Sequence, residues 1–336
     1  MNYQTVIGID VSKKKLDMCV LTKEGELNQD KLANTQKSIK KTLNSLLKAA
    51  GKANKVLICA EYTGAYIYPL VQAAKALSVD LWLENPTEIK YSSGMQRGKN
   101  DKVDAVRIAE YAQRYQDKAR LYEIGHEAIE RISSLYRERE GYVTTRAMYK
   151  ANIKDKQGFM PEKEYKGMVK RQNKLIKSLT KNIKEVEQKI DKLIKDDRTL
   201  SKQYEQITSV DAVGKQTAIY TMVTTRGFTR FKTPKQLCCH AGVAPFAYLS
   251  GSSQHSRWRV SHRANKTLKK LLHMAALSAI NMKGEMKEYY QRKLAEGKNA
   301  MSVLNAIRAK LIHRIYAVIK QDRKYEKNYT YSLVRT

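Results

Sequence analysis

The sequence predicts a mixed α/β domain at the N-terminus, a helical arm after it, and a mainly helical C-terminal domain. Three observations lead to this prediction. Short β-rich runs alternate with helical periods through the first 120 residues, hydrophobic residues recur every seven positions between 169 and 190, and helical segments separated by Gly-containing turns follow residue 201. A chain of 336 residues can form two or three domains that each bury a core. We place their boundaries at 1–120, 121–200 and 201–336.

The first domain has the predicted element order βββαβαβα. Two β-rich runs on either side of a short polar turn predict a hairpin, and a third strand follows. A helical period that ends at Gly51 comes next, and the run KVLICAEY is typical of a buried strand. The expected strands are 3–12, 16–23, 27–33, 55–62 and 79–86, and the expected helices are 35–51, 64–77 and a segment that begins near Asp101.

The middle segment has the repeat of a coiled coil. Apolar residues lie at heptad positions a and d over nearly four heptads, and Gln172 alone interrupts them. A reversal at Gly158–Pro161 precedes the repeat, so we expect a long antiparallel hairpin or a coiled-coil dimerisation arm. The alternative is one amphipathic helix packed on its own domain. The stripe consists of Val169, Ile176, Leu179, Ile183, Val186, Ile190 and Leu193.

The last domain begins with a segment that resembles a helix-hairpin-helix. Its turn, VDAVG, offers backbone N–H groups to a phosphate, although such turns are also common without a ligand. Thr233 and Pro234 start a further helix. The Ser-, Arg- and His-rich stretch 246–266 reads as a loop, and an amphipathic helix and a basic helical tail follow it.

The charge indicates a nucleic-acid partner. The chain carries 64 Lys and Arg against 33 Asp and Glu, a formal net charge of +31. Such an excess is favourable in a compact protein that binds a polyanion. Acidic residues are scarce, and 13 of them lie in residues 1–120 against 20 basic ones. We therefore expect the chemistry in the first domain and most of the binding in the other two.

Other classes fit the composition less well. No run of about 20 apolar residues is present and no apolar segment follows Met1, so we expect no membrane contact and a cytoplasmic, nucleoid-associated protein. The four cysteines, Cys19, Cys59, Cys238 and Cys239, form no CxxC pair. Their spacing predicts neither a disulfide framework nor a zinc site.

Four carboxylates in the first domain form a candidate metal site. Asp10 lies inside a β run, where an unpaired buried carboxylate would be costly, and Glu61 ends a buried strand. Asp101 and Asp104 are three residues apart near a helix start and share a face. Together these oxygens could hold one or two Mg²⁺ ions, or Mn²⁺ instead, for phosphoryl transfer. Singly, Asp101 could be a capping charge and Asp104 a solvated helix residue.

Two separated motifs carry a family resemblance. The order D…E…DxxD on a βββαβαβα frame resembles the RuvC-like branch of the ribonuclease-H fold. The phrase RGKNDKVDAVRIAEYA is similar to the signature of DEDD-type insertion-sequence transposases related to the Piv invertase. The segments CCHAGVAPFAYLSGSS and NKTLKKLLHMAALSA resemble the second domain of that family. The resemblance covers residues 5–118 and 205–280.

The resemblance implies a DNA transposase with a divided active site. It implies Asp10, Glu61, Asp101 and Asp104 as metal ligands and Ser250 as the nucleophile. It also implies a guide RNA made from the ends of the element, which pairs with donor and target DNA. The two half-sites lie in different domains, so we expect a composite site in a homodimer or homotetramer.

A serine attack on DNA would store the phosphodiester bond energy as phosphoserine, which permits strand exchange without ATP. From the sequence alone, the SGSS segment also fits an ordinary polar loop, and Ser252 and Ser253 compete for the role. His255 or His262 could shuttle protons, and Trp258 could stack on a base or anchor the loop. The candidate nucleic-acid contacts are Arg97, Lys99, Lys102, Lys215, Arg257, Trp258, Arg259, Arg263 and Lys266.

Two other functions remain open at this stage. One is a hydrolytic Holliday-junction nuclease that uses the carboxylates alone. The other is a non-catalytic nucleic-acid-binding protein whose acidic residues are structural.

Overall fold

A computed structural model gives the structure of the protein. It describes residues 3–25, 27–51, 54–92, 101–122, 127–245, 249–250, 254–255, 260 and 264–327, with only the backbone described at 65, 101–102, 249–250 and 254–255. The chain divides into two compact units, Met1–Ile124 and Gly125–Thr336.

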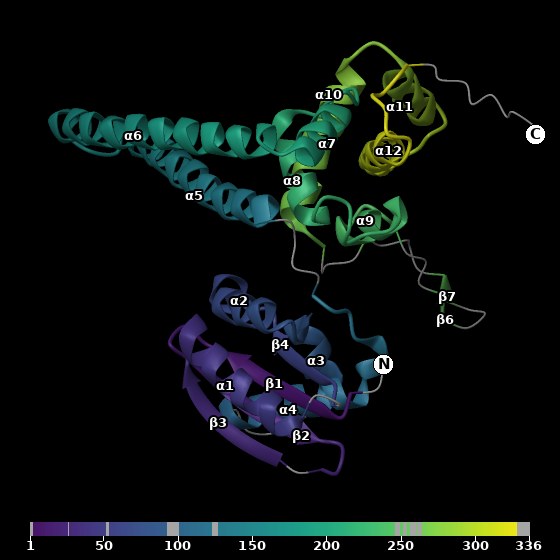
Figure 1. Ribbon diagram of the computed structural model, residues 1–336. Coiled ribbons are helices and arrows are strands. Elements are labelled where there is room, and N and C mark those ends of the chain that lie inside the picture. The colour runs from purple at the N-terminus through teal and green to yellow at the C-terminus, as the bar shows by residue number, and fades with distance from the viewer. Residues whose placement is uncertain are drawn as a thin grey trace, which may run out of the picture. The chain divides into compact units, whose positions relative to one another are not determined.

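A five-stranded mixed sheet forms the centre of unit 1 (Figure 1). The strand order is β3-β2-β1-β4-β5, in which β1, β2 and β3 are antiparallel neighbours and β4 and β5 run parallel to β1. The strands are β1 Thr5–Val11, β2 Lys15–Thr22, β3 Leu27–Ala33, β4 Val56–Glu61 and β5 Asp80–Glu84. The helices of this unit are α1 Gln36–Ala50, α2 Tyr68–Leu77, α3 Pro86–Ser92 and α4 Asp101–Arg114.

The predicted element order is confirmed, with α3 as an additional short helix between β5 and α4. Side chains that alternate along β1 pack on opposite faces of the sheet. Ile7 and Ile9 join Ile39 of α1 in one core, whereas Val6 joins Ile108 of α4 in another. Helix α4 therefore covers the face opposite to the one covered by α1 and α2.

Unit 2 is mostly helical, as predicted. Its helices are α5 Glu127–Lys156, α6 Glu162–Lys195, α7 Arg198–Thr208, α8 Lys215–Thr225, α9 Pro234–His240, α10 Lys266–Asn281, α11 Glu285–Ala295 and α12 Ala300–Lys320. A two-residue strand pair, β6 Leu249–Ser250 and β7 Gln254–His255, lies between α9 and α10. Among the helices that the structure describes, none is both long and apolar enough to cross a membrane.

Helices α5 and α6 form a long antiparallel pair that extends from the other helices of this unit (Figure 1). The Tyr165 hydroxyl donates to the Ile153 carbonyl near the turn, at 3.2 Å. Farther from the turn, Arg139 Nε donates to Glu187 at 2.7 Å. These contacts join early residues of one helix to late residues of the other, which defines an antiparallel hairpin.

The heptad stripe of α6 is covered to different degrees along its length. Ile183, Val186 and Ile190 are buried, whereas Val169 and Ile176 near the turn are only partly buried. The buried end of the stripe therefore packs within unit 2 and needs no second chain to cover it. Pairing of the hairpin with another copy of the chain stays a prediction.

The base of the hairpin and the C-terminal helices share one core. Ile132 of α5, Ile190 of α6, Ile207 of α7, Ile219 of α8 and Leu311 of α12 are all nearly inaccessible and belong to a single cluster. The helices after residue 200 and the inner end of the hairpin are therefore stabilised together.

Candidate active site

Two of the candidate carboxylates lie near the ends of neighbouring parallel strands, Asp10 next to the last residue of β1 and Glu61 as the last residue of β4. Ile9 of β1 pairs with Ala60 of the parallel strand β4, and Asp10 and Glu61 are the next residues of the two strands. Neighbouring parallel strands lie about 4.8 Å apart, so the two side chains occupy adjacent positions on one face. That face is the one that α4 covers, because Cys59 and Val6, two and four residues earlier, pack in the core that includes α4.

Helix α4 lies directly on β1 because Gly8 has no side chain. A Cβ at Gly8 would lie 2.3 Å from the Ala109 backbone nitrogen and 2.4 Å from the Ala105 carbonyl oxygen. This close approach is possible only with glycine at position 8 and with small residues on the helix. Asp10 follows Gly8 by two residues on the same face of the strand.

The direction of α4 sets where its acidic residues lie. Gln113 near its C-terminal end donates to the Thr22 carbonyl at 3.2 Å, and Thr22 pairs with Thr5 at the beginning of β1. Helix α4 therefore runs antiparallel to β1. Its first turn, with Asp101 and Asp104, lies toward the end of the strand that carries Asp10.

Asp104 already has a partner in this arrangement. Arg107, one turn later on α4, donates from a terminal guanidinium nitrogen to Asp104 Oδ1 at 3.0 Å. The Asp104 side chain is 28% exposed. A cation bound at Asp104 would compete with this ion pair.

The structure adds two carboxylates that the sequence reasoning missed. Asp17 of β2 pairs with Asp10, and Glu84 of β5 pairs with Glu61, so each occupies the next position along the same face. The signal for Asp17 was present in the hairpin, because a short turn brings opposite strand positions together. Glu84 ends a strand in the same way as Glu61. The row across the sheet is Glu84, Glu61, Asp10 and Asp17.

Two members of the row, Glu61 and Glu84, influence the same buried thiol. Burial raises the pKa of the Cys59 thiol, and the charges of Glu84 and then Glu61 raise it further. Burial and the charge of Glu84 also raise the pKa of Tyr111, whose hydroxyl lies 3.4 Å from Glu84 Oε2. Both carboxylates thus act on the same buried thiol beneath this end of the sheet.

The donor chemistry of the row fits a hard divalent cation, because carboxylate oxygens are the ligands that Mg²⁺ prefers. Among the side chains that the structure describes, no three of the Asp, Glu, His and Cys residues converge closely enough to hold one metal ion. The side chain of Asp101 is outside that set.

Ser250 lies in unit 2, in the short strand β6. Its backbone pairs with that of Gln254 in β7. Several other candidates lie outside the described residues, or are described by their backbone alone. Outside are Arg97, Lys99, Ser252, Ser253, Arg257, Trp258, Arg259, His262 and Arg263, whereas Ser250, Asp101, Lys102 and His255 are described by their backbone alone.

Described residues anchor both ends of the segment that carries Ser250. On its N-terminal side, Asn305 of α12 donates to the Val243 carbonyl at 2.7 Å. On its C-terminal side, Asn265 donates its backbone N–H to the His240 carbonyl at 2.8 Å and accepts a hydrogen bond from the Tyr220 hydroxyl at 3.2 Å. The segment thus begins and ends on the helical body of unit 2.

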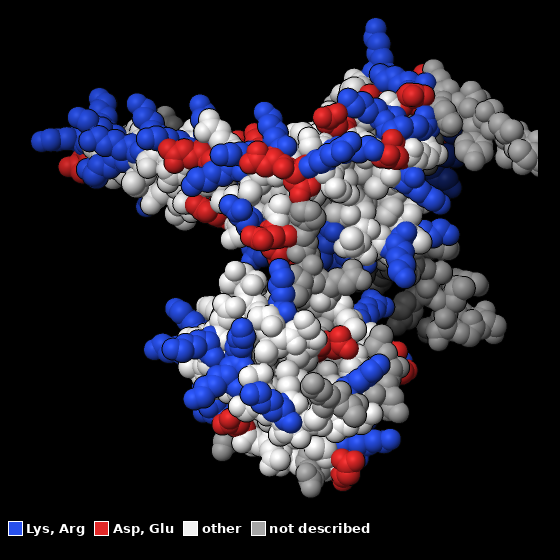
Figure 2. Space-filling model, in the orientation of Figure 1, with Lys and Arg blue, Asp and Glu red and all other residues white. Residues whose placement is uncertain are grey.

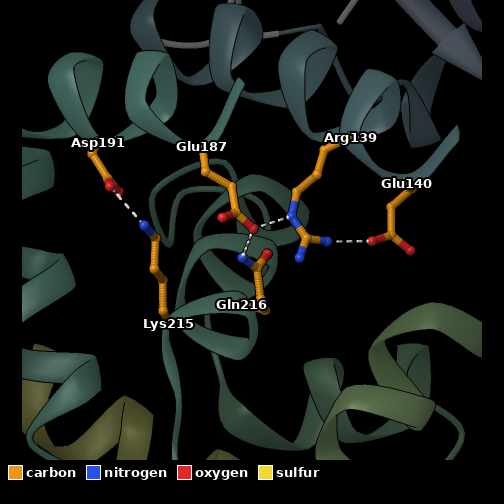
Figure 3. A network of polar contacts seen from close by, with 6 residues as sticks. All are labelled: Arg139, Glu140, Glu187, Asp191, Lys215 and Gln216. Atoms are coloured by element: carbon orange, nitrogen blue, oxygen red, sulfur yellow. Dashed lines mark hydrogen bonds and ion pairs between the residues drawn. The ribbon is translucent and has the colours of Figure 1, made fainter. Parts of the chain in front are cut away.

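Lys215, a candidate nucleic-acid contact, is part of a polar network at the start of α8 (Figure 3). Its ammonium lies 2.6 Å from Asp191 of α6. The next residue, Gln216, donates to Glu187 at 3.0 Å, and Arg139 of α5 donates to the same carboxylate. This network joins the first turn of α8 to the hairpin of α5 and α6, so contact of Lys215 with a phosphate would compete with an existing ion pair.

Exposed basic residues lie at the start of α10 and along the α5–α6 hairpin. Lys266 is exposed in the first turn of α10. Figure 2 shows Lys and Arg side chains crowded over the outer part of the α5–α6 hairpin. The sequence there includes the exposed residues Lys163, Lys166, Lys170, Arg171, Lys174 and Lys177. This surface is positively charged and suits a polyanion.

Comparison with known proteins identifies the class. Residues 7–156 match a transposase family, the DEDD transposases of IS110 type, and residues 204–291 match the family described as "Transposase IS116/IS110/IS902 family". The chain is a transposase, an enzyme of DNA recombination. It belongs to the IS110 family of DEDD transposases.

Similar proteins include two DNA-inverting relatives. The pilin gene-inverting protein of Moraxella lacunata is 26% identical over 327 residues, 96% of this chain and 98% of the relative. The pilin gene-inverting protein of Moraxella bovis is 25% identical over 327 residues, which are again 96% of this chain and 98% of the relative. An uncharacterised 43.6 kDa protein of insertion element IS110 from Streptomyces coelicolor is 30% identical over 36% of this chain and 29% of its own length.

Among solved structures, the chain is similar to Thermus thermophilus RuvC in complex with a Holliday junction substrate ("T. thermophilus RuvC"), with 13% identity and a TM-score of 0.28. The similarity covers 36% of this chain and 100% of that one. The family assignment rests on the two family matches.

Proposed function

We propose that the protein cuts and rejoins DNA at the ends of an insertion element, with Ser250 as nucleophile and with Asp10, Glu61, Asp101 and Asp104 as ligands of Mg²⁺ or Mn²⁺. The observation that carries the proposal is the placement of Asp10 and Glu61 at adjacent strand positions, on the face covered by the helix that begins with Asp101. This placement supports a shared site for carboxylates that are distant in sequence.

Each carboxylate has a defined task in this proposal. Asp10 and Glu61, fixed by the sheet, would bind the cation from one side, and the first turn of α4 would bind it from the other. When bound, Mg²⁺ would stabilise negative charge on the attacked phosphate and on an alkoxide. A cation bound at Asp104 would displace the ion pair between Arg107 and Asp104 Oδ1.

The covalent step conserves the phosphodiester. Ser250 Oγ attacks the phosphorus, one P–O bond of the DNA breaks, and the leaving DNA hydroxyl takes up a proton. The serine proton passes to a base, for which His255 and His262 are the candidates. A hydroxyl of another DNA end then attacks the phosphoserine and releases Ser250. The numbers of bonds and protons balance, so no ATP is required.

Two alternatives make different predictions. A hydrolytic nuclease would keep cleaving DNA after Ser250→Ala, whereas our proposal requires loss of the covalent protein–DNA species. A non-catalytic binding protein would behave identically after Asp10→Asn or in excess EDTA. The inversion of DNA named for the two Moraxella relatives favours strand exchange over hydrolysis, because inversion requires rejoining.

We further propose that the active site is composite, with carboxylates from one subunit and the serine from another, in a homodimer or homotetramer. Mixing Asp10→Asn protein with Ser250→Ala protein tests this arrangement. If subunits share the site, mixed oligomers contain one intact pair and recover covalent DNA. If one chain supplies both halves, no mixture recovers it.

The α5–α6 hairpin is the candidate for holding subunits together. Leu175 of α6 is 46% exposed, whereas Val186 is buried in the core. Leu175→Asp should leave the unfolding free energy of the chain nearly unchanged. It should nevertheless lower the mass measured by sedimentation if the hairpin pairs between copies. An unchanged mass would exclude this surface.

Specificity for the target would come from a guide RNA that pairs with donor and target DNA, as the family resemblance implies. The exposed cations of the hairpin support an RNA or DNA backbone as partner. Sequencing of the RNA that copurifies with the protein tests this proposal. A single non-coding RNA complementary to the insertion site would support it, and RNA of random origin would contradict it.

A further inference from the structure

A cavity of about 650 Å³ lies in unit 2 beside the beginning of the serine segment. Val243 and Pro245 form one wall, and α12 forms most of the rest. The volume falls within the range of about 300–1,000 Å³ that is usual for small-ligand sites. No role for this cavity follows from the carboxylates or from Ser250.

The cavity combines a small-residue floor with cations. Ala306 and Ala309 of α12 lie next to Val243, and Lys310 and Arg314 lie farther along the same face of the helix. Lys310 and Arg314 differ in whether a carboxylate pairs with them. Glu285 pairs with Arg314 and offsets its charge. Among the described residues, no carboxylate lies within ion-pair distance of Lys310.

An aromatic ring helps to position Lys310. Its ammonium lies 4.7 Å from the centre of the Tyr289 ring, a cation–π contact that leaves hydrogen-bond donors available. The exposed side chain of His313 lies one turn from Ala309 on the cavity face. This end of the cavity is therefore suited to an anion such as a phosphate.

A buried arginine helps to fix the wall that carries Val243. Arg308 is 5% exposed, and it contacts His273 Nδ1 at 2.7 Å and Asn305 Oδ1 at 3.4 Å. Asn305 in turn donates its amide to the Val243 carbonyl. Because both ends of the Asn305 amide are engaged, the wall that carries Val243 is fixed relative to α12.

The position of the cavity along the chain indicates what it binds. Pro245 precedes Ser250 by five residues, so their Cα atoms are no more than about 18 Å apart, a distance of about five stacked base steps. A DNA strand at Ser250 can therefore reach this cavity within a few nucleotides.

We propose that the cavity takes one unstacked deoxynucleotide of the DNA strand that is cut, with its base against Ala306 and Ala309 and its phosphate at Lys310. The inference rests on the proposed function for its substrate. It adds a site that holds the strand in register beside Ser250. The two alanines offer a small apolar surface without hydrogen-bonding groups for a base edge, so we expect the site to have little sequence preference.

The test uses full-length Ser250→Ala protein, so that binding is measured without chemistry and separately from the nucleophile assignment. The probe is a labelled single-stranded oligodeoxythymidine, and its control is an abasic strand of equal length. Ala309→Phe fills the cavity without a change of charge. It should weaken binding of the thymidine strand about tenfold and leave the abasic strand unaffected. Equal effects on both strands, or none, would overturn the proposal.

Lys310→Ala and its matched control complete the experiment. Lys310→Ala should weaken the binding of both oligonucleotides. Lys320→Ala, which removes an exposed lysine from the same helix, should weaken their binding clearly less. A matched oligouridine strand that binds more tightly, and that alone responds to Ala309→Phe, would assign the cavity to RNA and overturn the DNA proposal.

A second measurement does not depend on the folding of a variant. A strand that contains 5-bromodeoxyuridine is photo-crosslinked to the Ser250→Ala protein, and the peptides are identified by mass spectrometry. We expect crosslinks within 243–245 or 306–313. Crosslinks confined to other segments would overturn the proposal.

Discussion

Asp17 lies directly opposite Asp10 in the β1–β2 ladder, and Asp17 is only 3% exposed. Two lysines support it. Lys15 lies 3.2 Å and Lys31 3.6 Å from its carboxylate oxygens. Because cross-strand partners share a face, the negative charge of Asp17 adjoins the first candidate metal ligand. The two lysines offset the charge of Asp17. Strand β2 can therefore place a second carboxylate beside Asp10 at a lower electrostatic cost.

The first prediction concerns this support. Asp17→Asn should lower the unfolding free energy by about 1–2 kcal/mol, because it removes two partly exposed ion pairs at a buried acceptor. Urea unfolding measures the change. The control is Asp30→Asn, at an exposed position of β3, which should shift stability by less than about 0.5 kcal/mol. Equal effects of both variants would mean that Asp17 contributes nothing specific.

The second prediction concerns the contact of α4 with β1. Gly8→Ala should destabilise unit 1 by about 1–3 kcal/mol and displace α4 from the strand, because the new Cβ meets backbone atoms 2.3 Å and 2.4 Å away. Strand cleavage should fall with it. Gly141→Ala in α5 is the control, because nothing lies within 4 Å of its added Cβ. That change should leave stability equal or higher. Full cleavage by Gly8→Ala protein would contradict the assignment of the α4–β1 edge.

The third prediction concerns pH. Burial, and then the charge of Arg230, lower the pKa of His240 from 6.5 to about 4. The unfolded chain therefore binds a proton on this ring below about pH 6.5, whereas the folded chain does so only near pH 4. This contribution to stability is present above pH 6.5 and is lost as the pH falls toward 4.

Urea unfolding at several pH values checks this prediction. The wild-type protein should lose more stability between pH 6.5 and 4 than His240→Gln protein, in which this proton uptake is removed. His313→Gln, at an exposed position of α12, should retain the wild-type slope. Identical slopes for His240→Gln and the wild type would show that His240 does not titrate differently in the folded state.

The fourth prediction concerns the metal. Removal of divalent ions with EDTA should abolish the covalent protein–DNA species, and Mg²⁺ or Mn²⁺ should restore it. Calorimetric titration of Mn²⁺ should show weaker binding to Asp10→Asn protein, whereas Asp30→Asn protein should bind as the wild type does. Covalent DNA that forms at the normal rate in EDTA would rule out the metal role.

Much of unit 1 could be predicted because its elements have strong local signals. The short turn between β1 and β2, the apolar run of β4 and the period of α1 each indicate one element type. The position of α4 on the sheet could not be predicted from such local signals. It depends on Gly8, Ala105 and Ala109, small residues whose importance becomes visible only when the helix is laid on the strand.

The candidate site was predicted in part for the same reason. Asp10 is a lone carboxylate inside a β-rich run and Glu61 ends an apolar run, so the sequence itself points to both. Asp17 and Glu84 were missed because their membership depends on the register between strands, which the sequence determines only through the whole sheet. The cavity along α12 also depends on tertiary packing, because its walls come from three separate segments.

The sequence by itself determined the element order of unit 1, the helical character of unit 2, the excess of positive charge and the acidic motif of a DEDD transposase. These follow from local propensity, periodicity and composition. Tertiary structure decided the register that aligns Asp10 with Glu61 and Asp17, and the engagement of Lys215 by Asp191. Those depend on contacts between residues far apart in the chain, which form only when burial of the shared cores fixes the strands and helices against one another.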